Sequence, residues 1–197
     1  MNRNRTIISI YCAGGIKKGP KDATKLLWGE KERQEIQAIL TPLEVVFMRP
    51  DLRRDDIAND FTVFGRDHYQ VQSADYVIVD GREKRGIGVG IEMLSAKWFK
   101  RPLICVVPPN SHYRRPRLDY LGGTVRDYIH PHLASLADIV VDDFASAAKW
   151  IASFEKHPLP VKTISVIRNG INEYKKQQKS RDIPMSEIEQ KINKRKT

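Results

Sequence analysis

The sequence predicts an α/β protein with an open, doubly wound sheet of five parallel strands. Five short runs of apolar and β-branched residues recur along the chain, and a helical pattern follows each of them. Strands that are apolar at every position are typical of a parallel sheet with helices on both faces. Two glycine-containing loops each follow one of these strands, which places both loops at the sheet edge where such folds bind ligands.

The predicted elements alternate from the first strand onward. That strand is the run Thr6–Cys12, and the loop Ala13-Gly-Gly-Ile-Lys-Lys-Gly19 follows it. In chain order, the other elements are helix 29–40, strand 43–48, helix 61–73, strand 76–79, helix 91–99, strand 102–107, helix 125–136, strand 138–141 and helix 144–154. Residues 51–60 and 110–124 are predicted to be polar loops.

Charge divides the chain at about residue 157. Residues 1–157 contain 24 Lys and Arg against 20 Asp and Glu, a net charge of +4, whereas residues 158–197 contain 10 against 4, a net charge of +6. We therefore expect an α/β domain over 1–157 and a basic, helical C-terminal extension over 158–197. The extension contains one aromatic residue, Tyr174, so a solvated helix is favoured over the alternative of nucleic-acid attachment.

Composition and patterning exclude several classes of protein. The apolar runs are far shorter than the roughly 20 residues of a membrane span, and the N-terminal residues lack a signal-peptide pattern, so we expect a cytoplasmic protein with no membrane partner. Cys12 and Cys105 lie inside apolar strands and are expected to be buried free thiols. His130 and His132 have no Cys or carboxylate at ligand spacing, so surface histidines are favoured over a metal site. Neither a metal nor a cofactor is predicted.

Residues 86–92, Gly-Ile-Gly-Val-Gly-Ile-Glu, are the most informative stretch. We predict a loop that ends at the start of helix 91–99, which places Glu92 at a helix N-terminus. One interpretation is that Glu92 only complements the helix dipole. The glycines that alternate with aliphatic residues, Gly88 and Gly90 among them, favour a catalytic interpretation, because glycines expose backbone N–H groups and clear space beside the carboxylate. Glu92 is then a candidate nucleophile toward a sugar carbon.

A carboxylate nucleophile requires an acid to assist the leaving group. Asp67, in helix 61–73, is the candidate, since that helix precedes the strand that leads to Glu92. Asp75 begins the same strand and is explained as a turn residue. Asp80 ends the strand near the predicted active edge, where it could instead pair with Arg82 or Arg85.

The first loop is a candidate anion site. Gly14 and Gly15 would permit close approach of the backbone to an anion, and Lys17 and Lys18 stand beside them. The spacing matches neither a dinucleotide fingerprint nor a P-loop, and a purely structural turn stays open as the alternative. The basic loop 111–117 is likewise either solvated or in contact with an anion.

Three segments together resemble the nucleoside 2-deoxyribosyltransferase superfamily, and within it the 2'-deoxynucleoside 5'-monophosphate N-hydrolases. Residues 10–19 resemble the first strand and loop of that family. Residues 66–79 resemble its Asp-Leu followed by Ala-Asp-Val-Val-Val. Residues 88–93, Gly-Val-Gly-Ile-Glu-Met, resemble the Gly-Val-Gly-Tyr-Glu-Leu block that carries the nucleophile. The similarity in pattern covers about residues 6–155.

The resemblance implies a Rossmann-like enzyme that assembles as a homo-oligomer, a dimer or higher. It implies that Glu92 attacks the anomeric carbon, that Asp67 helps the nucleobase to leave, and that Tyr11 positions Glu92 or the sugar. The residues that it places on the sugar-phosphate side are Gly14, Ile16, Lys17, Gly88 and Gly90.

One position departs from the family pattern. Six residues before the nucleophile the family has Asp in transferases or Ser in the monophosphate hydrolases, whereas this chain has Gly86. Arg82, Lys84 and Arg85 are the candidates to replace the missing contact, and a different ligand is the alternative. The sequence therefore favours hydrolysis of the N-glycosidic bond of nucleoside 5'-monophosphates through a covalent glycosyl-Glu92 intermediate. Base exchange on free deoxynucleosides and a non-catalytic nucleotide-binding or sensor protein are the alternatives.

Overall fold

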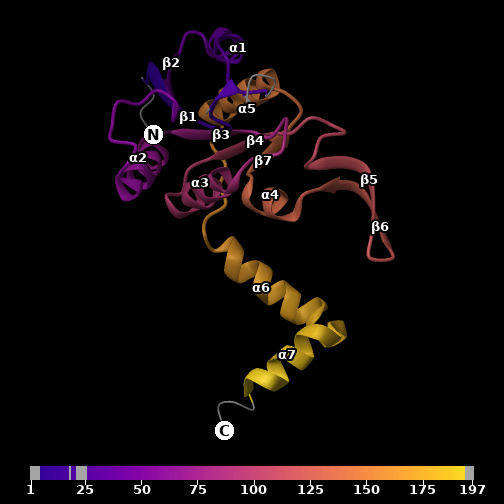
Figure 1. Cartoon of the computed structure of the whole chain (residues 1–197). Coiled ribbons are helices and arrows are strands. Elements are labelled where there is room, and N and C mark those ends of the chain that lie inside the picture. Colours follow the sequence, from indigo (N-terminus) through magenta and orange to yellow (C-terminus); the bar gives the residue numbers. More distant parts are fainter. Residues whose placement is uncertain (1–4, 18, 21–25, 194–197) are drawn as a thin grey trace. The chain divides into compact units, whose positions relative to one another are not determined.

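The structure is a computed structural model that describes residues 5–17, 19–20 and 26–193 (Figure 1). The chain divides into two compact units, Met1–Thr163 and Ile164–Thr197. Residues 158–163, which the sequence analysis assigns to the extension, belong to the first unit. The first unit contains every described residue among the candidate site residues.

The first unit is built on a five-stranded parallel sheet, which confirms the predicted fold class (Figure 1). The sheet order is β2-β1-β3-β4-β7. The strands are β1 (Ile7–Ala13), β2 (Glu44–Met48), β3 (Tyr76–Asp80), β4 (Leu103–Val106) and β7 (Ile139–Val141). All five residues of β3 and all four of β4 are buried, as expected for central strands covered on both faces.

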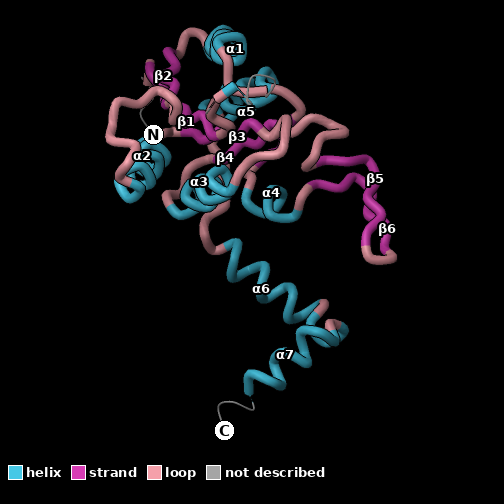
Figure 2. The backbone as a smooth tube through the Cα atoms, in the orientation of Figure 1, coloured by secondary structure: helices cyan, strands magenta, loops and turns pink. Residues whose placement is uncertain are grey.

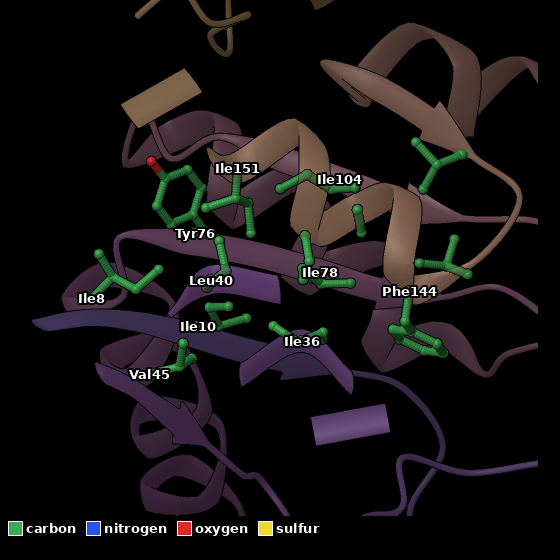
Figure 3. Packing of buried hydrophobic residues seen from close by; sticks show 14 of the residues in the cluster. Ile8, Ile10, Ile36, Leu40, Val45, Tyr76, Ile78, Ile104, Phe144 and Ile151 are labelled. Carbon is green, nitrogen blue, oxygen red and sulfur yellow. The ribbon is translucent and has the colours of Figure 1, made fainter. Parts of the chain in front are cut away.

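Helices cover the two faces of the sheet and enclose a separate core on each. On one face, α1 (Glu30–Leu40) and α5 (Phe144–Lys156) pack against side chains such as Ile8, Ile10 and Ile78 (Figure 3). On the other face, α2 (Asp60–Ser73), α3 (Ile87–Trp98) and α4 (Pro131–Leu136) cover the remaining strand side chains. Tyr11 belongs to this second core, and so do Val89, Met93 and Ala96 of α3.

Two predicted elements differ from the structure. Helix α3 begins at Ile87 rather than at residue 91, so the glycine-rich stretch forms the first turn of the helix instead of a loop. The predicted helix 125–136 is replaced by strand β6 (Gly123–Ile129) and the short helix α4.

Strand β6 pairs with β5 (Arg114–Tyr120) in an antiparallel hairpin that extends from the first unit (Figure 2). Leu121 and Gly122 form its turn with φ angles of 50° and 77°, a left-handed pair that matches the twist of two-residue hairpins. Helix α4 begins directly after the hairpin with Pro131 as its first residue, a position that favours proline.

The second unit consists of helix α6 (Val166–Gln177), a short 3-10 helix over Lys179–Arg181, and helix α7 (Ile183–Asn193). Neither α6 nor α7 contains a buried residue. The unit is held locally, since the Tyr174 hydroxyl donates to Asp182 Oδ2 at 2.9 Å and Lys179 Nζ lies 2.8 Å from Glu189 Oε2.

The two cysteines and the lengths of the helices can also be compared with the expectations from composition. Cys12 and Cys105 are both buried free cysteines, as predicted. Among the helices in the described part of the chain, none has both the length and the apolar composition that crossing a bilayer requires.

Candidate active site

The centre of the candidate site is a contact between strand β1 and helix α3. Tyr11 near the end of β1 donates a hydrogen bond from its hydroxyl to Glu92 Oε1 at 2.9 Å. The Tyr11 side chain is fully buried and Glu92 is only 9% exposed. The phenol thus fixes one carboxylate oxygen in a site that is nearly closed to solvent.

Glu92 does not cap its helix. Gly86 is the N-cap of α3 and Glu92 is the sixth helical residue, beyond the first turn in which the dipole and free amides act. It lies instead on the inner side of α3, three positions from Val89 and four from Ala96, both of which are buried. Since this side faces the sheet, the carboxylate is directed toward Tyr11 rather than toward the helix terminus.

The environment of Glu92 brings its titration close to neutral pH. The pKa of Glu92 is raised to about 7, chiefly by burial; the hydrogen bond from Tyr11 opposes this rise, and the charge of Asp67 adds a smaller contribution to it. Glu92 Oε2 is buried and has no hydrogen-bond partner within the described residues. Burial and the neighbouring Glu92 likewise raise the pKa of the Tyr11 phenol well above its ordinary value, so the phenol stays a donor. The result is a carboxylate with one fixed oxygen and one unpartnered oxygen.

Asp67 of α2 belongs to the same electrostatic cluster. Its charge raises the pKa of both Tyr11 and Glu92. Burial raises the pKa of Asp67 itself, against the lowering effect of Arg53 and Arg66. Arg53 Nη1 and Arg66 Nη1 lie 3.6 and 3.4 Å from Asp67 Oδ1. A carboxyl with a raised pKa is suited to hold a proton for a leaving group.

Arg53 and Arg66 also bind residues of the loop 51–60, which precedes α2. Arg53 is ion-paired with Asp55, and Arg66 Nη2 donates to the backbone oxygen of Leu52 at 2.6 Å. The sequence analysis treated 51–60 only as a polar loop and so missed Arg53. The signal available there was the alternation of acidic and basic residues, which indicates ion pairs without naming their partners.

The two glycines of the first loop allow close packing within the chain. A Cβ atom on Gly14 would lie 2.9 Å from Cδ1 of Trp28, and one on Gly15 would lie 2.9 Å from Cδ2 of Leu27. Trp28 Nε1 also donates to the backbone oxygen of Ala13 at 3.0 Å. The segment before α1 therefore lies directly on this loop, which favours the structural interpretation of the two glycines.

The other predicted contact residues differ in their surroundings. Ile16 is half-buried, the Lys17 side chain is exposed, and Lys18 lies outside the described residues. Gly88 and Gly90 are exposed, and a Cβ atom on either would meet no described atom within 4 Å. The first turn of α3 therefore has open space beside its backbone.

Arg85 is engaged within the protein. Its Nη2 lies 2.7 Å from Asp80 Oδ2 and donates to the backbone oxygen of Leu26 at 2.8 Å, and its side chain is 4% exposed. Asp80 is fully buried and also pairs with Arg82 Nε at 2.9 Å, as a buried charge requires. Arg82 Nη1 reaches Glu32 Oε1 at 2.7 Å. The network ties the segment before α1 to the end of β3.

Asp75 and the two histidines that were considered as metal ligands make contacts with other residues. Asp75 accepts hydrogen bonds from the backbone and hydroxyl of Ser9 at 2.7 and 2.6 Å, which joins the starts of β1 and β3. His130 and His132 stack edge-to-face with ring centroids 5.4 Å apart. In the described part of the chain, no group of three or more His, Cys, Asp or Glu side chains is placed to hold a metal ion.

Known proteins resemble the chain in structure and not in sequence. No protein-family model matches it, and no curated protein matches its sequence. A 2-desoxiribosyltransferase from Leishmania mexicana superposes with a TM-score of 0.50 at 20% identity, covering 77% of this chain and 99% of that one. This match shows a shared fold.

Two further solved structures score lower. A 2-deoxyribosyltransferase from Bacillus psychrosaccharolyticus has a TM-score of 0.45 at 14% identity, covering 79% of this chain and 98% of that one. A CMP N-glycosidase from Clostridium botulinum has a TM-score of 0.38 at 10% identity, covering 73% and 97%. Similarities of this size carry no conclusion about the present chain.

Proposed function

We propose that this chain is a nucleoside 2-deoxyribosyltransferase-like enzyme that hydrolyses the N-glycosidic bond of nucleoside 5'-monophosphates. One observation carries the proposal: Glu92 is buried, one of its oxygens accepts a hydrogen bond from Tyr11, and the other has no partner in the described chain. An ionised carboxylate that is desolvated in this way is energetically unfavourable unless it stabilises a positively charged group. The oxocarbenium-like carbon formed during glycoside cleavage is such a centre. The shared fold and the resemblance of residues 88–93 agree with this chemistry.

The reaction proceeds in two displacements at the anomeric carbon. In the first, Glu92 Oε2 forms a bond to C1' of the sugar while the bond from C1' to the base nitrogen breaks and its electron pair leaves with the base. Asp67 supplies the proton that neutralises the departing base. In the second, a water oxygen attacks C1', the ester to Glu92 breaks, and Asp67 takes back a proton. The products are the free base and the sugar 5'-phosphate.

Tyr11 has a positioning role in this scheme. Its hydroxyl donates to Oε1, which orients the carboxylate so that Oε2 is the attacking oxygen. The same hydrogen bond lowers the pKa of Glu92 and opposes the effect of burial. Because the nucleophile must be ionised, the rate of base release should rise with pH through about 7.

Base exchange is the second candidate, and a specific observation favours it. The solved structure with the highest similarity reported above is named as a transferase. The same ester intermediate gives exchange when a second base, rather than water, attacks C1'. The lysines beside the first loop favour hydrolysis of a phosphorylated substrate, because lysine is a common phosphate partner. A nucleotide sensor on the same fold would bind ligand without releasing base.

The test compares wild type with Glu92→Gln on a panel of ribo- and deoxynucleoside monophosphates and free nucleosides, each with and without an added base. Free base and exchanged nucleoside are measured by chromatography. The matched control is Glu35→Gln, which removes an exposed carboxylate on α1. We expect base release from monophosphates by wild type and by the control, and a loss of at least about a thousandfold in Glu92→Gln, whose ligand binding persists.

Other outcomes decide against the proposal. Base release by Glu92→Gln near the wild-type rate would exclude the ester mechanism. Exchange on free nucleosides without hydrolysis of monophosphates would identify a transferase. Saturable binding of nucleotides by wild type with no release of base from any member of the panel would identify a sensor.

A further inference from the structure

Four charged side chains of alternating sign lie together where the loop 51–60 meets helix α2. We call this set the α2 charge cluster; its members are Arg53, Asp55, Arg66 and Asp67. Arg53 Nη1 lies 3.6 Å from Asp67 Oδ1, and Arg66 Nε lies 3.7 Å from Asp55 Oδ1. The four side chains are only 16–26% exposed, so solvent screens these charges less than it screens charges on the open surface. The charge of each member therefore acts on the others.

Within the α2 charge cluster, Arg53 is hydrogen-bonded to Asp55 and not to Asp67. Its Nε donates to Asp55 Oδ1 at 2.8 Å, and its Nη2 donates to Asp55 Oδ2. Two parallel bonds of this kind are the bidentate pairing that guanidinium and carboxylate groups favour. The nitrogen of Arg53 nearest to Asp67 is Nη1, and its separation of 3.6 Å is too long for a hydrogen bond. Asp55 therefore occupies the edge of the guanidinium that could otherwise pair with Asp67.

Arg66 also makes its shortest contact with a group other than Asp67. Its Nη2 donates to the backbone oxygen of Leu52 at 2.6 Å, whereas its Nη1 lies 3.4 Å from Asp67 Oδ1. Both arginines approach Oδ1 of Asp67, and among the described residues Oδ2 has no hydrogen-bond partner. Asp67 is thus a carboxyl with two cations nearby and no short hydrogen bond that would favour its ionised form.

We propose that Asp55 is a positioning residue for base release: it holds Arg53 in the bidentate pair, and Asp67 thereby retains the proton that it gives to the departing base. The inference rests on the proposed function for the role of that proton. A hydrogen bond from a cation stabilises the ionised form of a carboxyl and so favours loss of its proton. A direct pair between Arg53 and Asp67 would therefore turn the proton donor into a permanently ionised carboxylate.

The electrostatics around Asp67 agree with this division of roles. Burial raises the pKa of Asp67, the charges of Arg53 and Arg66 oppose this rise, and the charge of Asp55 adds a smaller contribution to it. The hydrogen bond from Arg53 lowers the pKa of Asp55 to about 2, so Asp55 keeps its charge at every pH at which Asp67 exchanges its proton. The other titratable groups that interact with Asp67 are Tyr11 of β1, Glu92 of α3 and His68 of α2 itself. These three are unchanged in the variants of Arg53 and Asp55, so differences among those variants report on the pair.

The test follows the titration of the Asp67 carboxyl by NMR in protein labelled with 13C at the aspartate carboxyl carbons, and Asp67→Asn assigns its signal. The proteins compared are wild type, Asp55→Asn, Arg53→Gln and the double variant. Asp55→Asn keeps the shape of the side chain and removes its charge and one acceptor oxygen.

The matched control is Asp56→Asn in the same loop. Asp56 is exposed, and its Oδ1 accepts from the backbone nitrogen of Ala58 at 2.9 Å, a bond that an amide oxygen can also accept. Thermal unfolding checks that every variant is folded. Base release is measured in parallel at neutral pH, on the nucleoside monophosphate that wild type cleaves fastest.

We expect the pKa of Asp67 to fall in Asp55→Asn, because Arg53 then pairs with Asp67, and to rise in Arg53→Gln. The double variant should regain at least the wild-type pKa, since the cation itself is absent. A cation beside a carboxyl typically changes its affinity for a proton about tenfold or more. Base release should therefore fall on the order of tenfold in Asp55→Asn and recover in the double variant. The Asp56→Asn control should leave both the titration and the rate unchanged.

The titration separates this inference from the proposed function. If wild type releases no base while the titration of Asp67 follows the expected pattern, the proposed function fails and the control of Asp67 by Asp55 stands. If wild type releases base and Asp55→Asn leaves the titration of Asp67 unchanged, the inference is overturned and the proposed function stands. A loss of rate that persists in the double variant would likewise overturn it, because Asp55 would then only support the loop.

Discussion

Replacing Glu92 with Gln should remove a fall in stability between pH 5 and pH 8 while it abolishes the proposed chemistry. Burial raises the pKa of the Glu92 carboxyl from 4.5 to about 7. Between these values the native state retains a proton that the unfolded chain has released. The resulting stabilisation is fully present below pH 4.5 and is lost as the pH rises through about 7. The wild-type protein should therefore lose stability across this window, whereas the amide of the variant does not titrate.

The magnitude follows from the linkage between protonation and unfolding. A shift from 4.5 to about 7 makes the wild-type free energy of unfolding fall by roughly 2–3 kcal/mol between pH 5 and pH 8. The variant lacks this contribution, so the difference between the two proteins should change by that amount. For a domain of this size the change corresponds to roughly 5–10 °C in the midpoint of thermal unfolding.

The assay is thermal or urea unfolding of wild type and Glu92→Gln at pH 5 and pH 8, with Glu35→Gln as the exposed control. The amide of the variant occupies the buried, unpartnered Oε2 position, and this lowers the free energy of unfolding by the same amount at both pH values. The change in the difference between the two proteins from pH 5 to pH 8 is therefore free of that cost. Parallel pH dependence of wild type and Glu92→Gln would show that Glu92 is not desolvated in the native state. The physical basis of the proposed nucleophile would then be wrong.

Three further predictions concern Tyr11, Asp67 and the two lysines of the first loop. Tyr11→Phe removes the hydrogen bond that lowers the pKa of Glu92, so the acid limb of the pH profile for base release should move to higher pH; an unmoved limb would contradict the positioning role. Asp67→Asn should slow release most for bases that are poor leaving groups, and equal losses across bases of different pKa would make Asp67 a structural residue. Replacing Lys17 and Lys18 with Ala should raise KM for a monophosphate on the order of tenfold while hardly affecting a free nucleoside. Kinetics on both substrates decide the last point, since a similar loss for the two would argue against phosphate recognition.

Local patterns in the sequence were misleading in one region. In residues 125–136, Val125, Tyr128 and Ile129 stand three and four positions apart, which imitates the apolar face of a helix. The structure places them in a strand whose register pairs Val125 with Leu118. The glycine pair Gly122-Gly123 was the local signal for a hairpin, whose turn the structure places at Leu121 and Gly122. The pairing of β6 with residues 114–120 depends on contact between the two strands.

The glycine-rich stretch was misleading for a related reason. Glycine is a poor helix former, so residues 86–90 favour a loop by local propensity. In the structure they form the start of α3, because burial of Val89, Met93 and Ala96 against the sheet stabilises the helix. Tertiary packing therefore moved Glu92 from a helix terminus to the inner side of the helix.

The sequence by itself determined the five strands, their parallel arrangement and the identity of the unusual carboxylate, because periodicity and apolar runs are local properties of the chain. Only the tertiary structure decided what surrounds that carboxylate. Tyr11 and Glu92 are 81 positions apart, and their hydrogen bond exists because β1 pairs with the central strand β3, against which α3 packs. Arg85, which stays a predicted substrate contact, is ion-paired with the buried Asp80. Desolvation and ion pairing arise from which groups are buried together, and no local pattern encodes that.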